Sequence, residues 1–385
     1  MNRKNVIVYR KELLPLSETF VRNQAESLKT YLPIYVGRRR VAGLDLPSER
    51  TVVTNEKKSW GKLRKFLFRL MHGDRHLIST LASLKPALIH AHFEDGGVDS
   101  LALARALKIP LLVTCHGIDV TARDEVLWPN IAVRFWKRRR NKELFACARG
   151  FVAVSGFIKG KMIERGYPED RIVVHHIGVD TEKFSPDQSV SRTSEVLFVG
   201  RLVEKKGCEY LIRAMAAIQR SRQDAELVII GDGPLRASLE ALAQSENCRC
   251  RFLGAQRPDT VLHLLNRAGV FCLPSVTAAS GDSEGLPIVL CEAQAMGTPC
   301  ASFRHAGIPD VVVDGETGLL AEERDWRTLA AHIGRLLGEK ALWQRFSDAA
   351  MTRSRQMFDL AAQTRKLERL YENIANTLPP DEGRV

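Results

Sequence analysis

The stretch that decides the fold runs from residue 274 to residue 299 and reads PSVTAASGDSEGLPIVLCEAQAMGTP. It follows an apolar segment, Val270 to Leu273, that is typical of a buried strand, and its polar first half is expected to form a loop. A helix is expected from Pro287 to Met296, because proline is tolerated in a first turn and glycine, here Gly297, is common just past a helix end. The stretch therefore predicts a strand, a loop and a helix in succession.

The start of this helix is predicted to bind an anion. The amides of Gly285, Leu286 and Ile288 have no partner inside a helix and lie at the positive end of its dipole, an arrangement that binds phosphate. Glu284 and Glu292 flank this end with seven residues between them, and carboxylates accept hydrogen bonds from sugar hydroxyls. Acidic residues are also common near helix starts for dipole reasons alone. The combination of amides and carboxylates suits a nucleotide sugar.

Length and composition indicate a globular protein with more than one domain. The chain has 385 residues, and a domain commonly has about 100 to 200. Its hydrophobic content of 45% and charged content of 26% are ordinary for a protein that buries real cores. The formal net charge of +12 favours anionic partners such as phosphorylated substrates, acidic lipid headgroups or nucleic acid.

Neither a secretion signal nor a membrane span is expected. The first residues, MNRKNVIVYRKELL, lack the apolar core of a signal peptide, and no apolar run approaches the roughly 18 residues of a spanning helix. The eight cysteines show no zinc-site spacing, and several lie in apolar runs, where a reduced thiol is expected. These buried candidates are Cys115, Cys272, Cys291 and Cys300. We therefore expect a cytoplasmic protein.

Short apolar segments alternate with helical patterns along both halves of the chain, which is typical of parallel sheets covered by helices. Residues 38–55 receive no assignment, and a long final helix is expected over residues 359–376. Strands are expected at residues 6–9, 33–37, 87–93, 110–115 and 150–154 and, after a polar linker at 185–194, at residues 195–199, 226–230, 251–253, 270–273, 300–303 and 318–321. This pattern predicts two doubly wound α/β domains that face each other across a cleft, with ligands at the carboxyl ends of the strands.

A basic loop follows the strand expected at residues 195–199. Its sequence, GRLVEKKG, runs from Gly200 to Gly207 and leads into a helix, so it forms a plausible cradle for a diphosphate. Arginine can grip two phosphate oxygens at once, and lysine adds a point charge. A solvated basic turn would have the same composition. The later turn IGDGP, around Gly231, needs glycine conformations.

The string EGLPIVLCEAQAMGTPC, with its E-x7-E pair, resembles the donor-site signature of family 4 of the glycosyltransferases, which have the GT-B fold. The loop GRLVEKKG is similar to the family loop whose Arg and Lys bind the donor diphosphate, with Lys206 the better match and Lys205 the alternative. The turn at Gly231 would lie near the nucleotide base. Donor contacts are thereby implied for Gly200, Arg201, Lys206, Gly231, Gly285, Leu286, Ile288 and Glu292.

The same resemblance implies the domain boundaries. An acceptor-side Rossmann-like domain is expected over residues 1–184 and a donor-binding one over residues 185–358, with a C-terminal helix, residues 359–385, crossing back to the first. The string TCHGID resembles a family H-G motif at a strand end, whose His reaches the donor sugar and the developing charge. Catalytic roles are implied for Glu284, His116, Arg201 and Lys206.

Acceptor-side roles are implied for Ser17, Glu18, His92 and Asp119. The string SETFV, which begins at Ser17, departs from the Gly-rich loop of many family members. Together with SVTAA, which begins at Ser275, it resembles a branch associated with bacterial exopolysaccharide and colanic-acid-type assembly. His90 and His92 are expected on opposite faces of their strand, where they could not easily chelate one ion, and no metal site is predicted.

A second basic feature is the segment KKSWGKLRKFLFRLM, Lys57 to Met71, which is amphipathic on a helical wheel. A basic amphipathic helix with aromatics on its apolar face suits an anionic membrane surface, although the same face could pack on the first domain. The cluster WKRRR, Trp136 to Arg140, adds to the positive charge of this half. An enzyme at the inner face of the cytoplasmic membrane would use both segments.

These features predict a retaining hexosyltransferase that uses a nucleotide diphosphate sugar, needs no metal or cofactor and has no nucleic-acid partner. The acceptor is expected to be a glycan or a polyprenyl-diphosphate-linked oligosaccharide in exopolysaccharide or cell-surface polysaccharide synthesis. Glu292 would hold the ribose hydroxyls and Glu284 the sugar hydroxyls. One alternative is a hydrolysing nucleotide-sugar epimerase, for which only Glu94 and Asp95 are local acid/base candidates. The other is a non-enzymatic polyanion binder, whose binding would fall steeply with salt.

Overall fold

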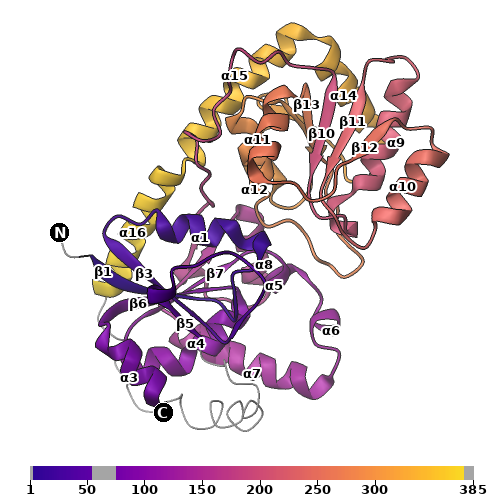
Figure 1. The fold of residues 1–385 in the computed structure, drawn as a ribbon. Helices are drawn as coiled ribbons and strands as arrows, with labels where there is room; N and C mark the ends of the chain where they lie inside the picture. The colour runs from indigo at the N-terminus through magenta and orange to yellow at the C-terminus, as the bar shows by residue number, and fades with distance from the viewer. Residues whose placement is uncertain (1–2, 54–74, 377–385) are drawn as a thin grey trace. The chain divides into compact units, whose positions relative to one another are not determined.

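The computed structural model describes residues 3–53 and 75–376 and divides into two α/β units (Figure 1). Unit 1 contains Met1–Val120, Asp124–Gly178 and Leu360–Val385, and unit 2 contains Thr121–Arg123 and Val179–Asp359. The main segment of unit 2 begins at residue 179, a few residues before the boundary expected at 185. Among the described residues, no helix is long and apolar enough to cross a membrane.

Unit 1 is built on a seven-stranded parallel sheet in the order β5-β3-β1-β6-β7-β8-β9. Its strands are β1 (Lys4–Tyr9), β3 (Tyr31–Gly37), β5 (Thr51–Val53), β6 (Pro86–His92), β7 (Leu111–Cys115), β8 (Gly150–Ala153) and β9 (Ile172–Val174), and β2 (Glu12–Leu13) pairs separately with β4 (Arg39–Arg40). Because the order reverses between β1 and β6, the ligand-binding edge expected for such a sheet lies where these two strands end.

Helices and short 3-10 turns connect the strands of unit 1. They are η1 (Leu16–Glu18), α1 (Thr19–Glu26), η2 (Ser48–Arg50), α3 (Arg75–Ser83), α4 (Glu94–Leu107), α5 (Ile118–Thr121), α6 (Asp124–Leu127), α7 (Ile131–Cys147), α8 (Gly156–Glu164), η4 (Glu169–Arg171) and α16 (Leu360–Asn376). Asn130 caps α7 and Ser155 caps α8, each by accepting hydrogen bonds from backbone N–H groups of the first turn.

The last helix, α16, belongs to unit 1 although it follows unit 2 in the sequence (Figure 1). Leu367, Tyr371 and Ile374 fall on one face at helical spacing and are buried among side chains of β1, β3, β6, β7 and β8. The cluster comprises Val6, Leu28, Tyr31, Leu88, Leu112, Val152, Leu367, Tyr371 and Ile374. Burial of each large side chain stabilises the fold by about 1.5–3 kcal/mol, so this face is what fixes α16 to unit 1.

Unit 2 is built on a six-stranded parallel sheet in the order β12-β11-β10-β13-β14-β15. Its strands are β10 (Glu195–Val199), β11 (Glu226–Ile230), β12 (Cys250–Phe252), β13 (Val270–Leu273), β14 (Cys300–Phe303) and β15 (Gly318–Ala321). Its helices are η5 (Glu204–Lys206), α9 (Cys208–Gln219), α10 (Arg236–Ser245), α11 (Pro258–Arg267), α12 (Ile288–Ala295), α13 (Ile308–Val311), α14 (Trp326–Gly338) and α15 (Lys340–Met357). The strand order reverses between β10 and β13.

Most of the predicted elements are confirmed. The stretch quoted first forms β13, a loop and α12, which begins after Pro287 and ends before Gly297, a residue with φ of +64°. The unassigned residues 38–55 contain the two-residue strand β4 and the edge strand β5, and β2 and β9 were likewise missed. These strands have only two or three residues, too few to show a hydrophobic pattern. The four cysteines expected in apolar runs are buried and unbridged.

Candidate active site

Two loops meet at the strand-order reversal of unit 2. The first follows β10 and holds the basic residues of GRLVEKKG, and the second follows β13 and runs to the start of α12. Neighbouring parallel strands end at the same edge of a sheet, so both loops lie at the edge where open α/β sheets bind ligands. The Val276 N–H donates to the carbonyl of Lys205 (2.8 Å) and ties the loops together.

Glycine is required at two points of this edge. Gly207 has φ of +61°, and a Cβ there would lie 1.9 Å from the carbonyl oxygen of Pro274. Gly231 has φ of +133°, and a Cβ there would lie 1.9 Å from the carbonyl oxygen of Gly200. Any other residue would push the loops apart at these points. The two glycines therefore allow three loops to pack backbone against backbone.

The centre of the edge is a buried contact between Lys206 and Glu284. The Lys206 ammonium lies 2.6 Å from Glu284 Oε1, which also accepts a hydrogen bond of 2.9 Å from Ser275 Oγ. Burial alone would raise the pKa of Glu284, but the charges of Lys206 and Lys205 and the two hydrogen bonds outweigh it and lower this pKa to about 2. Glu284 is thus a carboxylate at neutral pH, and its second oxygen accepts none of the hydrogen bonds found among the described residues.

The helix start beside Glu284 offers backbone donors. Pro287 is the N-cap of α12 and supplies no side-chain acceptor. Within the described part of the chain, the N–H groups of Gly285, Leu286 and Ile288 form no hydrogen bond. Unused N–H groups at the positive end of a helix dipole attract anions. The three amides predicted from the sequence are thus available in the structure.

Glu292 differs from Glu284 in its surroundings. It lies on α12, and within residues 3–53 and 75–376 its carboxylate has no hydrogen bond or ion pair. Burial raises its pKa to about 7, and the charge of Lys183 opposes this shift only in part. The pKa of Glu284 therefore lies below the ordinary value of a glutamate and that of Glu292 lies above it. The oxygens of Glu292 can accept hydrogen bonds from hydroxyl groups.

The other predicted donor residues divide into available and engaged groups. The Arg201 side chain is exposed, and no described residue pairs with it. Lys205 is held by Asp282 at 2.9 Å, so Lys206 is the cation nearer to Glu284. The Gly200 N–H donates to Ile230 and the Gly231 N–H to Gly254, so neither amide is available to a ligand.

In unit 1 the predicted residues gather at the ends of β6 and β7. His92 Nδ1 lies 3.0 Å from His116 Nε2, and the two rings are stacked with their centroids 5.2 Å apart. Burial holds the pKa of both rings well below the usual range, with the charge of Arg10 acting in the same direction. Both rings are therefore neutral at pH 7. His116 Nδ1 is buried, and it has no hydrogen-bond partner among the described residues.

The expectation that His90 and His92 face opposite sides of their strand is wrong. Their ring centroids lie 4.4 Å apart, because successive side chains alternate and residues two apart share one face. His90 is nevertheless occupied by structural partners, Tyr371 at Nδ1 (2.6 Å) and Thr114 at Nε2 (2.6 Å). In the described parts of the chain, no group of three or more His, Cys, Asp or Glu side chains is arranged to hold a metal ion.

Asp119 and Glu94 form the buried acidic part of unit 1. Asp119 Oδ1 accepts hydrogen bonds from the N–H groups of His116 (3.1 Å) and Gly117 (2.9 Å), and Oδ2 accepts one from Glu94 (3.2 Å). Burial raises the pKa of Asp119 to about 6, and the charge of Glu94 adds to this although the N–H groups oppose it. Asp119 therefore holds the backbone that carries His116.

The two partners of Glu94 were not predicted from the sequence. This side chain is 1% exposed, its Oε1 lies 3.0 Å from Lys137 Nζ, and its Oε2 accepts a hydrogen bond of 2.7 Å from Tyr167. Lys137 belongs to the basic cluster WKRRR, which was expected to serve a membrane contact, but its side chain is buried, with 5% exposed. Successive side chains of a helix point in different directions, so Lys137 on α7 need not face the same way as the neighbouring arginines. This difference in direction was the signal that the sequence offered.

The segment that begins at Ser17 is anchored by Arg10, a residue that the sequence analysis missed. Glu18 is buried and accepts three hydrogen bonds from Arg10, at 2.8, 2.9 and 3.1 Å, whereas Ser17 is exposed. The Arg10 guanidinium also lies over the ring of Phe93, 4.1 Å from its centroid. Arg10 follows β1 and Phe93 follows β6, so this contact lies at the strand-order reversal of unit 1.

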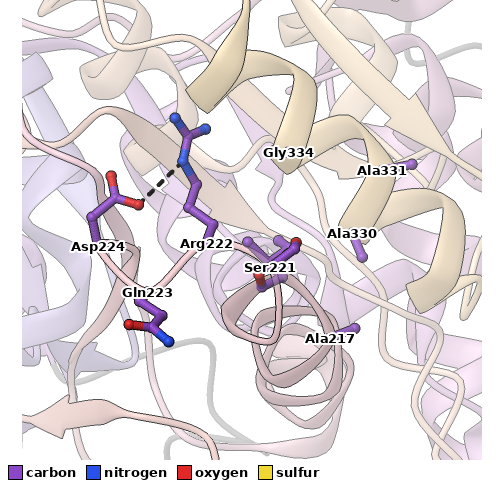
Figure 2. Close-up of a pocket in the computed structure, with 9 residues that line it drawn as sticks. Ala217, Ser221, Arg222, Gln223, Asp224, Ala330, Ala331 and Gly334 are labelled. Atoms are coloured by element: carbon purple, nitrogen blue, oxygen red, sulfur yellow. Dashed lines mark hydrogen bonds and ion pairs between the residues drawn. The ribbon is translucent and has the colours of Figure 1, made fainter.

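A surface pocket lies elsewhere in unit 2, between the C-terminal end of α9 and α14 (Figure 2). It has a volume of about 740 Å³ and is lined mainly by small side chains, with an ion pair between Arg222 and Asp224 at its rim. None of the predicted site residues lines it. The amphipathic segment Lys57 to Met71 lies outside the described residues.

Residues 34–183 match the model of Glycosyltransferase Family 4, and residues 180–353 match that of Glycosyl transferases group 1. The amylovoran biosynthesis glycosyltransferase AmsK of Erwinia amylovora is 30% identical over 292 residues, which cover 75% of this chain and 70% of that protein. The putative colanic acid biosynthesis glycosyltransferase WcaL of Escherichia coli is 31% identical over 249 residues, which cover 63% of this chain and 59% of that protein.

Solved structures support the same architecture. HepE of Anabaena, crystallised in complex with UDP, superposes with a TM-score of 0.78 at 18% identity, covering 97% of this chain and 100% of that one. Sucrose-phosphate synthase of Thermosynechococcus elongatus superposes with a TM-score of 0.76 at 20% identity, covering 97% and 99%. At these identities the likeness establishes the fold, two doubly wound α/β units of the GT-B type.

Proposed function

The chain belongs to family 4 of the glycosyltransferases and has their GT-B fold, and we propose that it transfers a hexosyl group from a nucleotide diphosphate sugar to a glycan acceptor. The observation that carries the proposal is the edge at β10 and β13. There, Lys206, Glu284 and three unused amides of the α12 start lie together. Cations and amides suit a pyrophosphate, and the carboxylates suit hydroxyls.

Each group of this edge has a task in the proposed reaction. Arg201, Lys206 and the amides of Gly285 and Leu286 stabilise the charge that develops on the departing diphosphate. Glu284 accepts hydrogen bonds from sugar hydroxyls through the oxygen that the lysine does not use. Glu292 binds the ribose hydroxyls, and such a contact lowers the free energy of a carboxyl group that has no partner among the residues the structure describes.

We further propose that the reaction retains the anomeric configuration and needs no metal ion. The bond between the anomeric carbon and the diphosphate oxygen breaks, and the acceptor oxygen forms its bond on the same face. The acceptor's proton passes to the leaving phosphate, so no protein nucleophile is required. In this scheme Arg201 and Lys206 supply the positive charge at the leaving group. The role of His116 toward the donor sugar stays a prediction from the family resemblance.

The acceptor that we propose is a lipid-linked or free glycan of exopolysaccharide synthesis. This proposal rests on the amylovoran and colanic acid roles printed for AmsK and WcaL. UDP or UDP-glucose is bound in the HepE structures, so UDP-sugars are the first donors to try.

One face of α7 supports a membrane location for such an acceptor. Ile131 and Phe135, one turn apart, are 75% and 76% exposed, and the exposed Arg138 and Arg139 follow on the next turn. Exposed apolar side chains beside cations suit the surface of an anionic bilayer. Cosedimentation with vesicles of anionic or zwitterionic phospholipid tests this, with Phe135→Ser as the variant and Val173→Ser, an exposed residue elsewhere in unit 1, as its control. Only Phe135→Ser should reduce binding to anionic vesicles, and equal binding by all three proteins would refute the contact.

The alternatives gain no support. The matches are to glycosyltransferases, and Glu94, one of two acid/base candidates for an epimerase, is committed to Lys137 and Tyr167. Asp95, the other, is paired with Arg10 and Lys11. A polyanion binder would need no carboxylate at its anion site.

The experiment is incubation with a panel of nucleotide sugars, with and without a lipid-linked glycan acceptor. We expect acceptor-dependent release of a nucleoside diphosphate and a product enlarged by one hexose, with the anomeric configuration of the donor and in the presence of a chelator. An isomerised sugar formed without acceptor would identify an epimerase instead. A product of inverted configuration, or activity abolished by the chelator, would refute the finer parts of the proposal.

A further inference from the structure

His305 is a buried histidine at the end of β14, the strand next to β13 in unit 2. It is 4% exposed, and its Nδ1 lies 2.9 Å from Glu323 Oε2. Its Nε2 is buried as well and has no hydrogen-bond partner among the described residues. A buried polar atom without a partner is uncommon in folded proteins and calls for an explanation, such as a water, an ion or a ligand that it binds.

The tautomer of the ring follows from Glu323. This carboxylate only accepts hydrogen bonds, and it is fixed in place by the N–H of Thr277 (2.9 Å). In the neutral ring the proton therefore lies on Nδ1, and Nε2 is an acceptor. Burial lowers the pKa of His305, although the charges of Glu323 and Glu284 oppose this and that of Lys205 adds to it. The ring is accordingly neutral at pH 7, and Nε2 calls for a donor such as a hydroxyl.

The loop that carries His305 adjoins the proposed donor site. The Gly307 N–H donates to the backbone carbonyl of Glu284 (3.4 Å), and Glu284 and Lys205 are close enough to act on the ring electrostatically. Glu284 already holds Lys206 and Ser275. His305 Nε2 thus adds an uncharged hydrogen-bond acceptor near Glu284, whose Oε1 is already bonded to Lys206 and Ser275.

We propose that His305 Nε2 accepts a hydrogen bond from a hydroxyl of the donor's sugar and so helps to determine which hexose is accepted. The proposal rests on the function proposed above and deepens it. A site that hydrogen-bonds a substrate hydroxyl discriminates against sugars that lack it, because its own polar atom is then left without a partner. The nucleotide makes no use of this contact.

The test compares the affinity for a nucleotide sugar with that for its bare nucleotide, using UDP-glucose against UDP and GDP-mannose against GDP. In His305→Asn the amide takes the place of Nδ1 and keeps the partner Glu323, but no atom replaces Nε2. In His305→Gln an amide oxygen can take the place of Nε2. We expect His305→Asn to bind the nucleotide sugar about 3- to 10-fold more weakly with unchanged binding of the bare nucleotide, and His305→Gln to recover part of the loss.

Equal weakening of both ligands in His305→Asn would mean that His305 only braces the loop, and unchanged affinity for both would mean that Nε2 contacts nothing. Either result overturns the inference while the wild type still binds nucleotide sugars. A wild type that binds none of the four probes would instead remove the proposed function, and the inference with it. If His305→Asn fails to fold, Glu323→Gln serves in its place. The amide of glutamine can donate as well as accept, so it no longer holds the His305 ring in one tautomer. This variant should also lower the affinity for the nucleotide sugar and leave the affinity for the bare nucleotide unchanged.

Discussion

The two units share one topology, and their strand-order reversals differ in how their polar groups are used. In unit 1 the reversal at β1 and β6 is filled by contacts within the protein, such as Arg10 with Glu18 and Phe93. In unit 2 the reversal at β10 and β13 leaves Arg201, Glu292 and three amides without partners among the described residues. The same fold position can therefore serve either stability or ligand binding, depending on whether its polar groups are paired within the protein.

The largest effect is expected from breaking the buried pair of unit 1. Lys137→Ala leaves the carboxyl group of Glu94, which is 1% exposed, without its cation, and removal of one partner of a buried pair costs about 3–5 kcal/mol. Denaturant unfolding measures the loss. Lys142→Ala, a change at an exposed lysine of the same helix, is the control and should cost almost nothing. Equal stability of the two variants would contradict the assignment of Lys137 to the core.

The corresponding change in unit 2 should affect turnover and leave stability alone. Arg201→Ala removes an exposed cation, which no described residue pairs with, from the proposed diphosphate site, so turnover should fall by about 10²- to 10³-fold with thermal unfolding unchanged. Arg220→Ala, at an exposed arginine just past α9, is the matched control. Wild-type turnover in Arg201→Ala would show that this loop plays no part in catalysis.

A smaller effect, on pH dependence, should distinguish the two carboxylates of unit 2. Glu292 has a folded pKa of about 7 against an ordinary value of 4.5, so the folded state holds its proton more tightly than the unfolded one. The stability from this group is complete below pH 4.5 and is lost as the pH rises through 7. Glu284 has the opposite pH dependence, because its folded pKa of about 2 lies below the ordinary value of 4.5. Its contribution to the free energy of unfolding is lost as the pH falls from 4.5 towards 2.

Thermal unfolding from pH 4 to pH 8 therefore tests Glu292→Gln. This variant should become more stable relative to the wild type as the pH rises from about 4.5 to about 7, because it has no carboxylate to ionise. Parallel stability curves for the two proteins over that window would show that Glu292 is not held in a poorly solvated position.

The smallest effect is expected where a hydrogen bond is purely structural. Tyr371→Phe removes the 2.6 Å contact of α16 with His90 and should cost about 0.5–1.5 kcal/mol, with turnover unchanged. Denaturant unfolding and a transfer assay measure the two quantities. A large loss of turnover would mean that the His90 to His92 region takes part in the reaction.

Much of this architecture could be predicted from the sequence, because buried parallel strands are short apolar runs that end in loops. All six strands of unit 2 were found, whereas in the seven-stranded sheet of unit 1 β5 and β9 were missed because each contributes only three residues at a sheet edge. The amides at the start of α12 were predicted from Pro287 and the helix pattern, and no residue in the described ranges pairs with them. Local sequence therefore predicts what one strand, loop and helix will do.

Partners that are distant in the sequence could not be predicted. Arg10, Lys137 and His305 each owe their position to a residue on another element, respectively Phe93, Glu94 and Glu323. Lys137 belongs to a run of four basic residues in the sequence. Its burial becomes evident only from its position on α7. The opposite pKa shifts of Glu284 and Glu292 likewise depend on which cations reach each carboxylate.

The most direct test of the central claim, that unit 2 binds a pyrophosphate at the β10 and β13 edge, is calorimetric titration with a nucleoside, its monophosphate and its diphosphate. We predict that the diphosphate of at least one of uridine and guanosine binds the wild type more tightly than its monophosphate, and that Arg201→Ala removes most of this difference. Equal affinity for mono- and diphosphate in the wild type, or a difference unchanged in Arg201→Ala, would contradict the account.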